Sequence, residues 1–141
     1  MKPPLVFSLL LPLSVGGFEV FTFLLDTPAS EWTKLPWSRI DTVCLAGWLD
    51  PDLVSLAHST NTRVAFIANY PKDQLLNATN RKAWVQEQLE YAKKNHLDGV
   101  NFDFEDPLEA GSPESKAYTR LLKETVAVFH RQLPGSKVGS F

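Results

Sequence analysis

The 141-residue sequence contains a single cysteine, Cys44. No disulfide can therefore form within the chain, and a metal site built on several thiolates is excluded. Cys44 lies in an apolar run from Thr42 to Ala46, which favours a buried structural thiol over a nucleophile. The three histidines, His58, His96 and His130, lack the spacing of metal ligands and are expected at the surface or at helix ends. We expect neither a metal nor an organic cofactor.

An excess of basic residues is also lacking. The chain has 14 Lys and Arg against 16 Asp and Glu, which gives a net charge of -2. No segment is basic enough to bind along the phosphate backbone of a nucleic acid, so a nucleic-acid partner is not expected. The sequence also lacks a glycine-rich loop that cradles phosphates and a hydrophobic run long enough to cross a membrane. With 44% hydrophobic residues, it has the composition of an ordinary globular protein.

The first 17 residues differ from the rest. Lys2 precedes an apolar run from Leu5 to Val15 and the small pair Gly16-Gly17, a pattern typical of a secretory signal peptide. The alternative is a buried N-terminal strand, which the prolines of this segment disfavour. We predict a signal peptide at 1–17 and a domain from 18 to 141. Passage through the secretory pathway would make Asn77, in Asn77-Ala78-Thr79, an acceptor for N-linked glycosylation.

After residue 17, the apolar pattern and the turn signals predict alternating strands and helices. Helices are expected to begin after the capping residues Asp50, Asn80 and Ser112, whereas the first crossover contains no strong helix. Trp32, Trp37 and Trp84 are interpreted as packing residues. Strands separated by helices imply a parallel sheet with right-handed crossovers. The expected strands are 18–25, 41–47, 63–68 and 98–105, and a fifth begins within 136–141.

The most informative segment is the octapeptide from Asp98 to Glu105, with the sequence DGVNFDFE. In a strand, its spacing would place Asn101, Asp103 and Glu105 on one face and apolar residues on the other. A solvated polar face is the simplest interpretation of an isolated Asp-x-Glu. Here the flanking helices direct that face into a barrel or crevice, where unpaired charges are unfavourable without a function.

Ligands of parallel α/β folds bind beyond the carboxyl ends of the strands, where Glu105 is expected. Trp48 and the pair Asn69-Tyr70 follow the second and third strands at the same edge. These three residues are candidates for binding substrate, with packing in the core or at the rim as the alternative.

The octapeptide resembles the strand-four signature of glycoside hydrolase family 18, Asp-Gly-x-Asp-x-Asp-x-Glu. Further segments resemble the di-N-acetylchitobiase branch of this family: 18–21, 37–43, 57–59, 122–125 and 129–131. Asn101, where most members have aspartate, is typical of that branch. The resemblance runs from about 18 to 141 and implies the N-terminal half of a TIM (β/α)8 barrel, with about four βα units and the start of strand five.

The resemblance also implies a function, the hydrolysis of the N,N'-diacetylchitobiose core of asparagine-linked oligosaccharides in the lysosome. The reaction would need no cofactor and would retain the configuration at the anomeric carbon. In this substrate-assisted exception to the two-carboxylate scheme, the acetamide oxygen of the substrate is the nucleophile. Glu105 would be the general acid and then the base. Asp103 would orient the acetamide and favour a protonated Glu105, and Asn101 would support Asp103 by hydrogen bonding.

The length of the chain leaves alternatives open, because a family barrel needs eight strands and about 250 residues. A fragment of a longer gene product, a truncated isoform and halves that assemble as oligomers would each account for 141 residues. We expect the chain alone to be inactive. A non-catalytic chitinase-like carbohydrate-binding protein and an inactive truncated isoform are the alternative functions, and the presence of Glu105 argues against the first.

Overall fold

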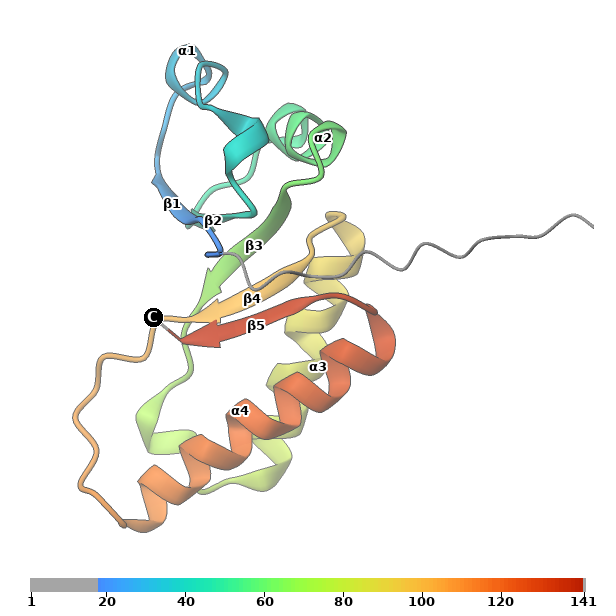
Figure 1. Cartoon of the computed structure of the whole chain (residues 1–141). Helices are drawn as coiled ribbons and strands as arrows, with labels where there is room; N and C mark the ends of the chain where they lie inside the picture. Colours follow the sequence, from blue (N-terminus) through green and yellow to red (C-terminus); the bar gives the residue numbers. More distant parts are fainter. Residues whose placement is uncertain (1–17, 141) are drawn as a thin grey trace, which may run out of the picture.

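The computed structural model describes residues 18–140; the predicted signal peptide at 1–17 and Phe141 lie outside the described residues. Five strands form one parallel sheet in the order of the sequence (Figure 1). The predicted α/β class, with four βα units and a fifth strand, is confirmed. The strands are β1 (Phe21–Leu25), β2 (Thr42–Ala46), β3 (Arg63–Ala68), β4 (Gly99–Phe102) and β5 (Lys137–Ser140).

Helices connect consecutive strands, and α3 and α4 lie side by side (Figure 1). The α-helices are α1 (Ala29–Trp32), α2 (Pro51–Ser59), α3 (Ala78–Lys94) and α4 (Pro113–Gln132), with short 3-10 turns at η1 (Trp37–Arg39) and η2 (Lys72–Gln74). None of the helices in the described part of the chain is long and apolar enough to span a membrane.

Side chains alternate across the sheet and divide it into two different faces. One face packs under the helices and supplies the hydrophobic core, with fully buried side chains such as Val43, Val64, Val100 and Phe102. The opposite face carries the alternate residues, which are mostly apolar, such as Phe23, Cys44 and Ile67, with Asn101 among them in β4. The core therefore holds the strands from the helical side, and Asn101 lies on the other face.

The sheet is strongly curved, as an ion pair between its two ends demonstrates. Glu19, just before β1, accepts a hydrogen bond from Lys137 Nζ of β5 at 2.7 Å, and from Thr42 Oγ1 of β2 at 3.0 Å. In a flat sheet, strands one and five would lie roughly 19 Å apart at 4.8 Å per strand. The side chains of Glu19 and Lys137 can meet only because the sheet curls around the face opposite the helices and brings its two ends together, as in a barrel.

Local capping signals predicted two helix starts correctly and one incorrectly. Asp50 accepts a hydrogen bond from Asp52 N at 2.9 Å in α2, and Ser112 Oγ accepts one from Ser115 N at 3.1 Å in α4. The prediction that Asn80 caps α3 is wrong. Asn77 is the N-cap instead, since its Oδ1 accepts from the backbone N–H groups of the second and third helical residues, at 3.0 and 3.1 Å.

The prediction of a strand from Asp98 to Glu105 is also too long, because β4 ends at Phe102. Phe102 pairs with the last residue of β3 on one side and the last residue of β5 on the other. Beyond it, only one further bond continues the ladder, from Asp103 N to Ala68 O at 3.1 Å. Glu105 therefore lies in a loop after the strand, and strand alternation does not fix its direction.

The tryptophans interpreted as packing residues do pack. Trp32 and Trp37 are buried in the first crossover, and Trp37 Nε1 donates to Trp32 O at 2.9 Å. Trp84 of α3 is half-buried between Tyr70 and Phe102, with ring centroids 5.5 and 5.2 Å away. Only short helical turns occur in the first crossover, as expected.

Candidate active site

The lower end of β4, where the octapeptide begins, is a structural junction. Asp98 Oδ2 accepts hydrogen bonds from Val64 N at 2.8 Å and from His58 Nε2 at 2.7 Å. A Cβ atom on Gly99 would overlap the carbonyl oxygen of Lys137 in β5. The first two residues of the motif thus serve strand pairing: a carboxylate joins β4 to β3 and α2, and a glycine admits β5.

Asn101 lies in the middle of β4, on the face opposite the helices. It pairs with Ile67 of β3 and Gly139 of β5, and 2% of its surface is exposed. Its Oδ1 has no hydrogen-bond partner among the described residues. An unsatisfied buried acceptor is unfavourable by about 1–3 kcal/mol, and Ser136 Oγ is the other buried side-chain oxygen of the described residues in this state. The expected hydrogen bond from Asn101 to Asp103 is not among the contacts of the described chain.

Asp103 follows β4 at the carboxyl edge of the sheet and is exposed. Its negative charge acts on Cys44 in β2: burial, the larger cause, and the Asp103 charge together raise the pKa of the Cys44 thiol to about 12. Cys44 is buried and stays a neutral thiol, in agreement with the structural interpretation of this residue.

Glu105 is exposed, and no hydrogen bond or ion pair joins its carboxylate to the rest of the described chain. The loop that carries it is held on both sides. Phe104 stacks on Tyr118 of α4 with ring centroids 4.5 Å apart, and Lys72 Nζ donates to Pro107 O at 2.5 Å. The glutamate is therefore a free acid on an anchored loop, next to Asp103.

The three candidate substrate-binding residues, Trp48, Asn69 and Tyr70, have different surroundings in the structure. Trp48 is half-buried, and its Nε1 donates to Leu24 O at 2.9 Å. Asn69 is exposed, and both residues line a pocket at the ends of β2 and β3. Tyr70 is 2% exposed and its hydroxyl donates to Gln74 O at 3.2 Å, so it belongs to the core, the alternative considered for it. The pKa of the Tyr70 hydroxyl is raised, mainly because the group is buried.

Sequence reasoning missed two residues that hold this edge of the sheet. Arg81 of α3 is buried; its Nη1 donates to Leu75 O at 2.6 Å and its Nε to Glu124 of α4 at 3.4 Å. Lys72 holds the Glu105 loop. Neither residue carries a local signal, because each acts on a carbonyl or carboxylate from another part of the chain.

Among residues 18–140, no three His, Cys, Asp or Glu side chains are placed to hold a metal ion together. The chemistry that this edge offers is that of carboxylates: Glu105 can donate or accept a proton, and Asp103 can hold a polar group or stabilise a positive charge.

Comparison with known proteins identifies relatives over most of the chain. The sequence is 38% identical to rat di-N-acetylchitobiase over 121 residues, 86% of this chain and 32% of the rat protein. It is 37% identical to the human protein over the same length, covering 31% of it. The chain thus spans about a third of these relatives. No family model matches the sequence.

Solved structures agree on the fold. The chitinase domain of the spore coat protein CotE from Clostridium difficile matches with a TM-score of 0.70 at 17% identity, over 88% of this chain and 41% of that domain. A chitinase from Rhizomucor miehei matches with a TM-score of 0.64 at 18% identity, over 84% of this chain and 45% of that one. The five-stranded sheet and its helices therefore have the fold of part of the barrel of these chitinases, as predicted.

The family follows from a relative that the chain covers more completely. Bovine di-N-acetylchitobiase is 38% identical over 120 residues, which are 85% of this chain and 67% of the bovine sequence. The resemblance to the di-N-acetylchitobiase branch, inferred from the segments around the octapeptide, is confirmed, and the chain belongs to the di-N-acetylchitobiase family.

Proposed function

We propose that this chain supplies the catalytic strand of a glycosidase that hydrolyses the N,N'-diacetylchitobiose core of asparagine-linked oligosaccharides. The observation that carries the proposal is the state of Glu105: an exposed carboxylate without a protein partner, on an anchored loop at the carboxyl edge of a parallel sheet. Glu109 of the same loop also lacks a partner, so it is the position of Glu105 at the end of the Asp98–Glu105 octapeptide that distinguishes it. A carboxylate held free at this edge is available to a substrate.

The reaction requires two proton transfers from one position. Glu105 donates a proton to the glycosidic oxygen while the acetamide oxygen of the sugar attacks the anomeric carbon and the bond to the leaving sugar breaks. Glu105, now a carboxylate, removes a proton from a water molecule that opens the resulting oxazolinium ion. Two inversions at the anomeric carbon give retention of configuration.

Asp103 is assigned to the acetamide. A carboxylate beside the forming oxazolinium ion stabilises its positive charge and aligns the acetamide oxygen for attack. The position of Asp103 supports this role, since it is exposed directly after β4 at the carboxyl edge of the sheet. Asn101, two residues before Asp103 in the chain, offers a buried oxygen without a partner in the described chain.

The setting of this activity is part of the proposal. Residues 1–17 would direct the chain into the secretory pathway, with the lysosome as its destination. Asn77 is exposed in Asn77-Ala78-Thr79 and is available there for glycosylation.

A second candidate applies to the isolated chain, namely saccharide binding without turnover. Among the described strands, β1 pairs only with β2, and β5 only with β4. No described strand continues the sheet beyond β1 or β5, so a sugar held on the face opposite the helices has contacts from these five strands only. Binding without hydrolysis is the expected behaviour of this chain by itself.

The test combines the isolated chain with a chimaera. In the chimaera, residues 18–140 replace the matching segment of rat di-N-acetylchitobiase, and turnover of 4-nitrophenyl N,N'-diacetylchitobioside is measured. We expect hydrolysis by the chimaera and none by the chain alone. Glu105→Gln should lower the kcat of the chimaera by a factor of about 10²–10⁴, the usual contribution of a general acid.

Glu109→Gln is the matched control, because Glu109 is exposed in the same loop and its carboxylate makes no hydrogen bond or ion pair to the described chain. It should leave kcat unchanged. A Glu105→Gln chimaera with the circular dichroism of the parent and undiminished turnover would rule out Glu105 as the acid. A folded parent chimaera that binds the chitobioside without cleaving it would contradict the glycosidase assignment and favour the binding function.

A further inference from the structure

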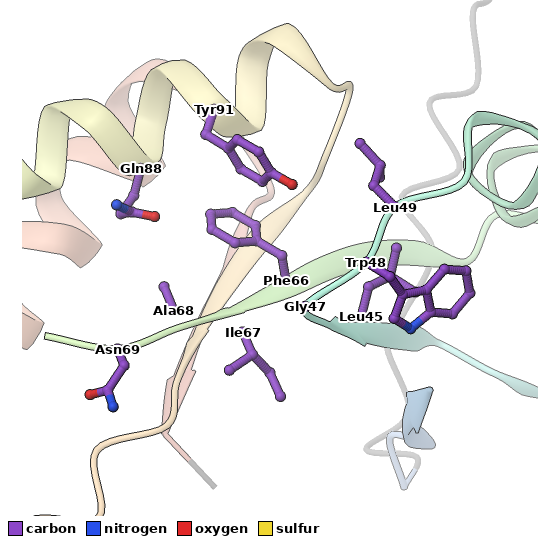
Figure 2. A pocket seen from close by; sticks show the side chains of 10 residues that line it. All are labelled: Leu45, Gly47, Trp48, Leu49, Phe66, Ile67, Ala68, Asn69, Gln88 and Tyr91. Carbon is purple, nitrogen blue, oxygen red and sulfur yellow. The ribbon is translucent and has the colours of Figure 1, made fainter. Parts of the chain in front are cut away.

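A pocket of about 410 Å³ lies outside the proposed active site, between the ends of β2 and β3 and the helix α3 (Figure 2). Its size falls within the roughly 300–1,000 Å³ of small-molecule sites. Helix α3 packs against α4 on its other side and has few contacts with α2, which leaves the pocket accessible. Asp103 and Glu105 do not line it, so it is a separate place on the molecule.

Two aromatic rings form one wall. Phe66 of β3 and Tyr91 of α3 meet edge to face, with centroids 4.9 Å apart and an angle of 61° between the rings. Phe66 is buried, whereas 40% of Tyr91 is exposed. Figure 2 shows Tyr91 reaching from the helix toward Phe66, with Leu49 across from them. The wall presents a fixed apolar surface that water does not solvate well.

Two polar groups without protein partners in the described chain lie beside this wall. Asn69 is not one of them, because its side chain lies on the other side of β3 from Phe66 and Gln88 (Figure 2), where its Oδ1 accepts a hydrogen bond from Tyr70 N at 2.8 Å. The Gln88 amide and the Tyr91 hydroxyl make no hydrogen bond to any described residue. An amide both donates and accepts, so the pocket can satisfy hydroxyl or amide groups of a ligand in either sense.

The charge of the lining narrows the class of ligand. None of the residues that line the pocket is charged. A phosphate or carboxylate would therefore lack a countercharge, and a metal ion would lack carboxylate or imidazole ligands. A wholly apolar ligand would cover the Gln88 amide and the Tyr91 hydroxyl without satisfying them. The remaining class is a neutral molecule with an apolar face and an edge of hydrogen-bonding groups.

We propose that this pocket binds a neutral saccharide, with a pyranose ring lying against the wall of Phe66 and Tyr91 and its hydroxyl or acetamide groups hydrogen-bonded to the Gln88 amide and the Tyr91 hydroxyl. The C–H face of a pyranose matches the aromatic wall, and its equatorial groups match these two polar groups. The site does not depend on Glu105, and its occupation does not require hydrolysis.

The test is a titration of the full chain with N-acetylglucosamine, followed by the shifts of backbone amides in NMR spectra. We expect shifts at Gly47, Asn69 and Tyr91. Tyr91→Ala should weaken binding roughly tenfold, the equivalent of a lost aromatic contact. Glu87→Ala is the matched control on the same helix: Glu87 is exposed and does not line the pocket, and its removal should have no effect.

Glu105→Gln separates this proposal from the proposed active site, because it should leave these shifts unchanged. If Tyr91→Ala unfolds the chain, Gln88→Ala replaces it, with the same expected loss of affinity. Shifts confined to residues around Asp103 and Glu105, or affinity unaffected by both pocket variants, would overturn the proposal. So would tighter binding of inorganic phosphate, or of the aromatic anionic dye anilinonaphthalenesulfonate, at Tyr91.

Discussion

The two ends of β4 use the same residue types in opposite ways. At the lower end, Asp98 accepts two hydrogen bonds and Gly99 lies where a side chain would collide with β5. At the upper end, Asp103 is exposed and Glu105 is bonded to nothing in the described chain. Between them, Asn101 is buried with an unsatisfied oxygen.

The difference indicates that the first residues of the octapeptide stabilise the fold, whereas its last acids are free to contact a substrate. An acid that is bonded by backbone N–H groups is committed to the fold, and its removal leaves buried donors without partners. An acid that the fold leaves free contributes little to stability and can exchange protons with a substrate. Changes at the lower end should therefore alter unfolding, and changes at the upper end should alter only binding or turnover.

The largest loss of stability is expected from Gly99→Ala. The new Cβ atom would overlap the Lys137 carbonyl, so β4 and β5 must move apart, which should lower the free energy of unfolding by about 3 kcal/mol. Urea denaturation measures this change. Gly111→Ala is the comparison in the upper loop: space is free there, and only its φ of 78° opposes a side chain, at about 1 kcal/mol. Equal losses would contradict a close approach at Gly99.

Asp98→Ala and Asp103→Ala test the comparison most directly. Removing Asp98 leaves the Val64 N–H without its carboxylate partner, and the free energy of unfolding should fall by about 2 kcal/mol. Asp103→Ala removes an exposed acid and should change it by about 0.5 kcal/mol or less. The same urea titrations serve both variants. A larger loss for Asp103→Ala would show that stability lies at the upper end instead.

Asn101→Leu sharpens the contrast in the middle of the strand. Leucine has a similar volume and removes the unsatisfied oxygen, so we expect the free energy of unfolding to stay level or rise by about 1 kcal/mol. Thermal unfolding would detect such a rise. In a catalytic chimaera, the same change should impair turnover. A marked loss of stability would mean that Asn101 is a structural residue like Asp98.

The smallest effect concerns pH. The pKa of the Glu19 carboxyl is lowered, mainly by the hydrogen bond that it accepts from Lys137. A carboxylate with a lowered folded-state pKa adds stability above its unfolded-state pKa, and this stability is lost as the pH falls through the folded-state value. Wild-type chain should thus lose more stability than Glu19→Gln between neutral and acidic pH. Parallel pH profiles of the two unfolding midpoints would contradict a contribution from Glu19.

Local chemistry predicted much of this fold from the sequence. The third strand, 63–68, was placed at its observed bounds because a β-branched and aromatic run ends at polar residues on both sides. Asp50 and Ser112 began their helices as expected, since each is followed by proline. The family signature identified the candidate acids before their positions in space were known.

Other features depend on partners distant in sequence. The upper end of β4 is set by where β3 and β5 stop, so Asp98–Glu105 alone could not show that Glu105 lies beyond the strand. The Glu19–Lys137 pair joins residues 118 positions apart. Asn77 and Asn80 are both good caps by composition, and the helical hydrogen bonds of the folded chain decide between them.

The cap at Asn77 has a consequence for modification. Its two hydrogen bonds to the helix use Oδ1 alone. N-linked glycosylation attaches sugar to the other atom of the amide, Nδ2, and leaves the carbonyl oxygen in place. A glycan at Asn77 would therefore extend from the start of α3 without uncapping the helix. Replacing Asn77 to remove the glycan would remove the cap as well, so the two losses must be separated by a substitution at Thr79.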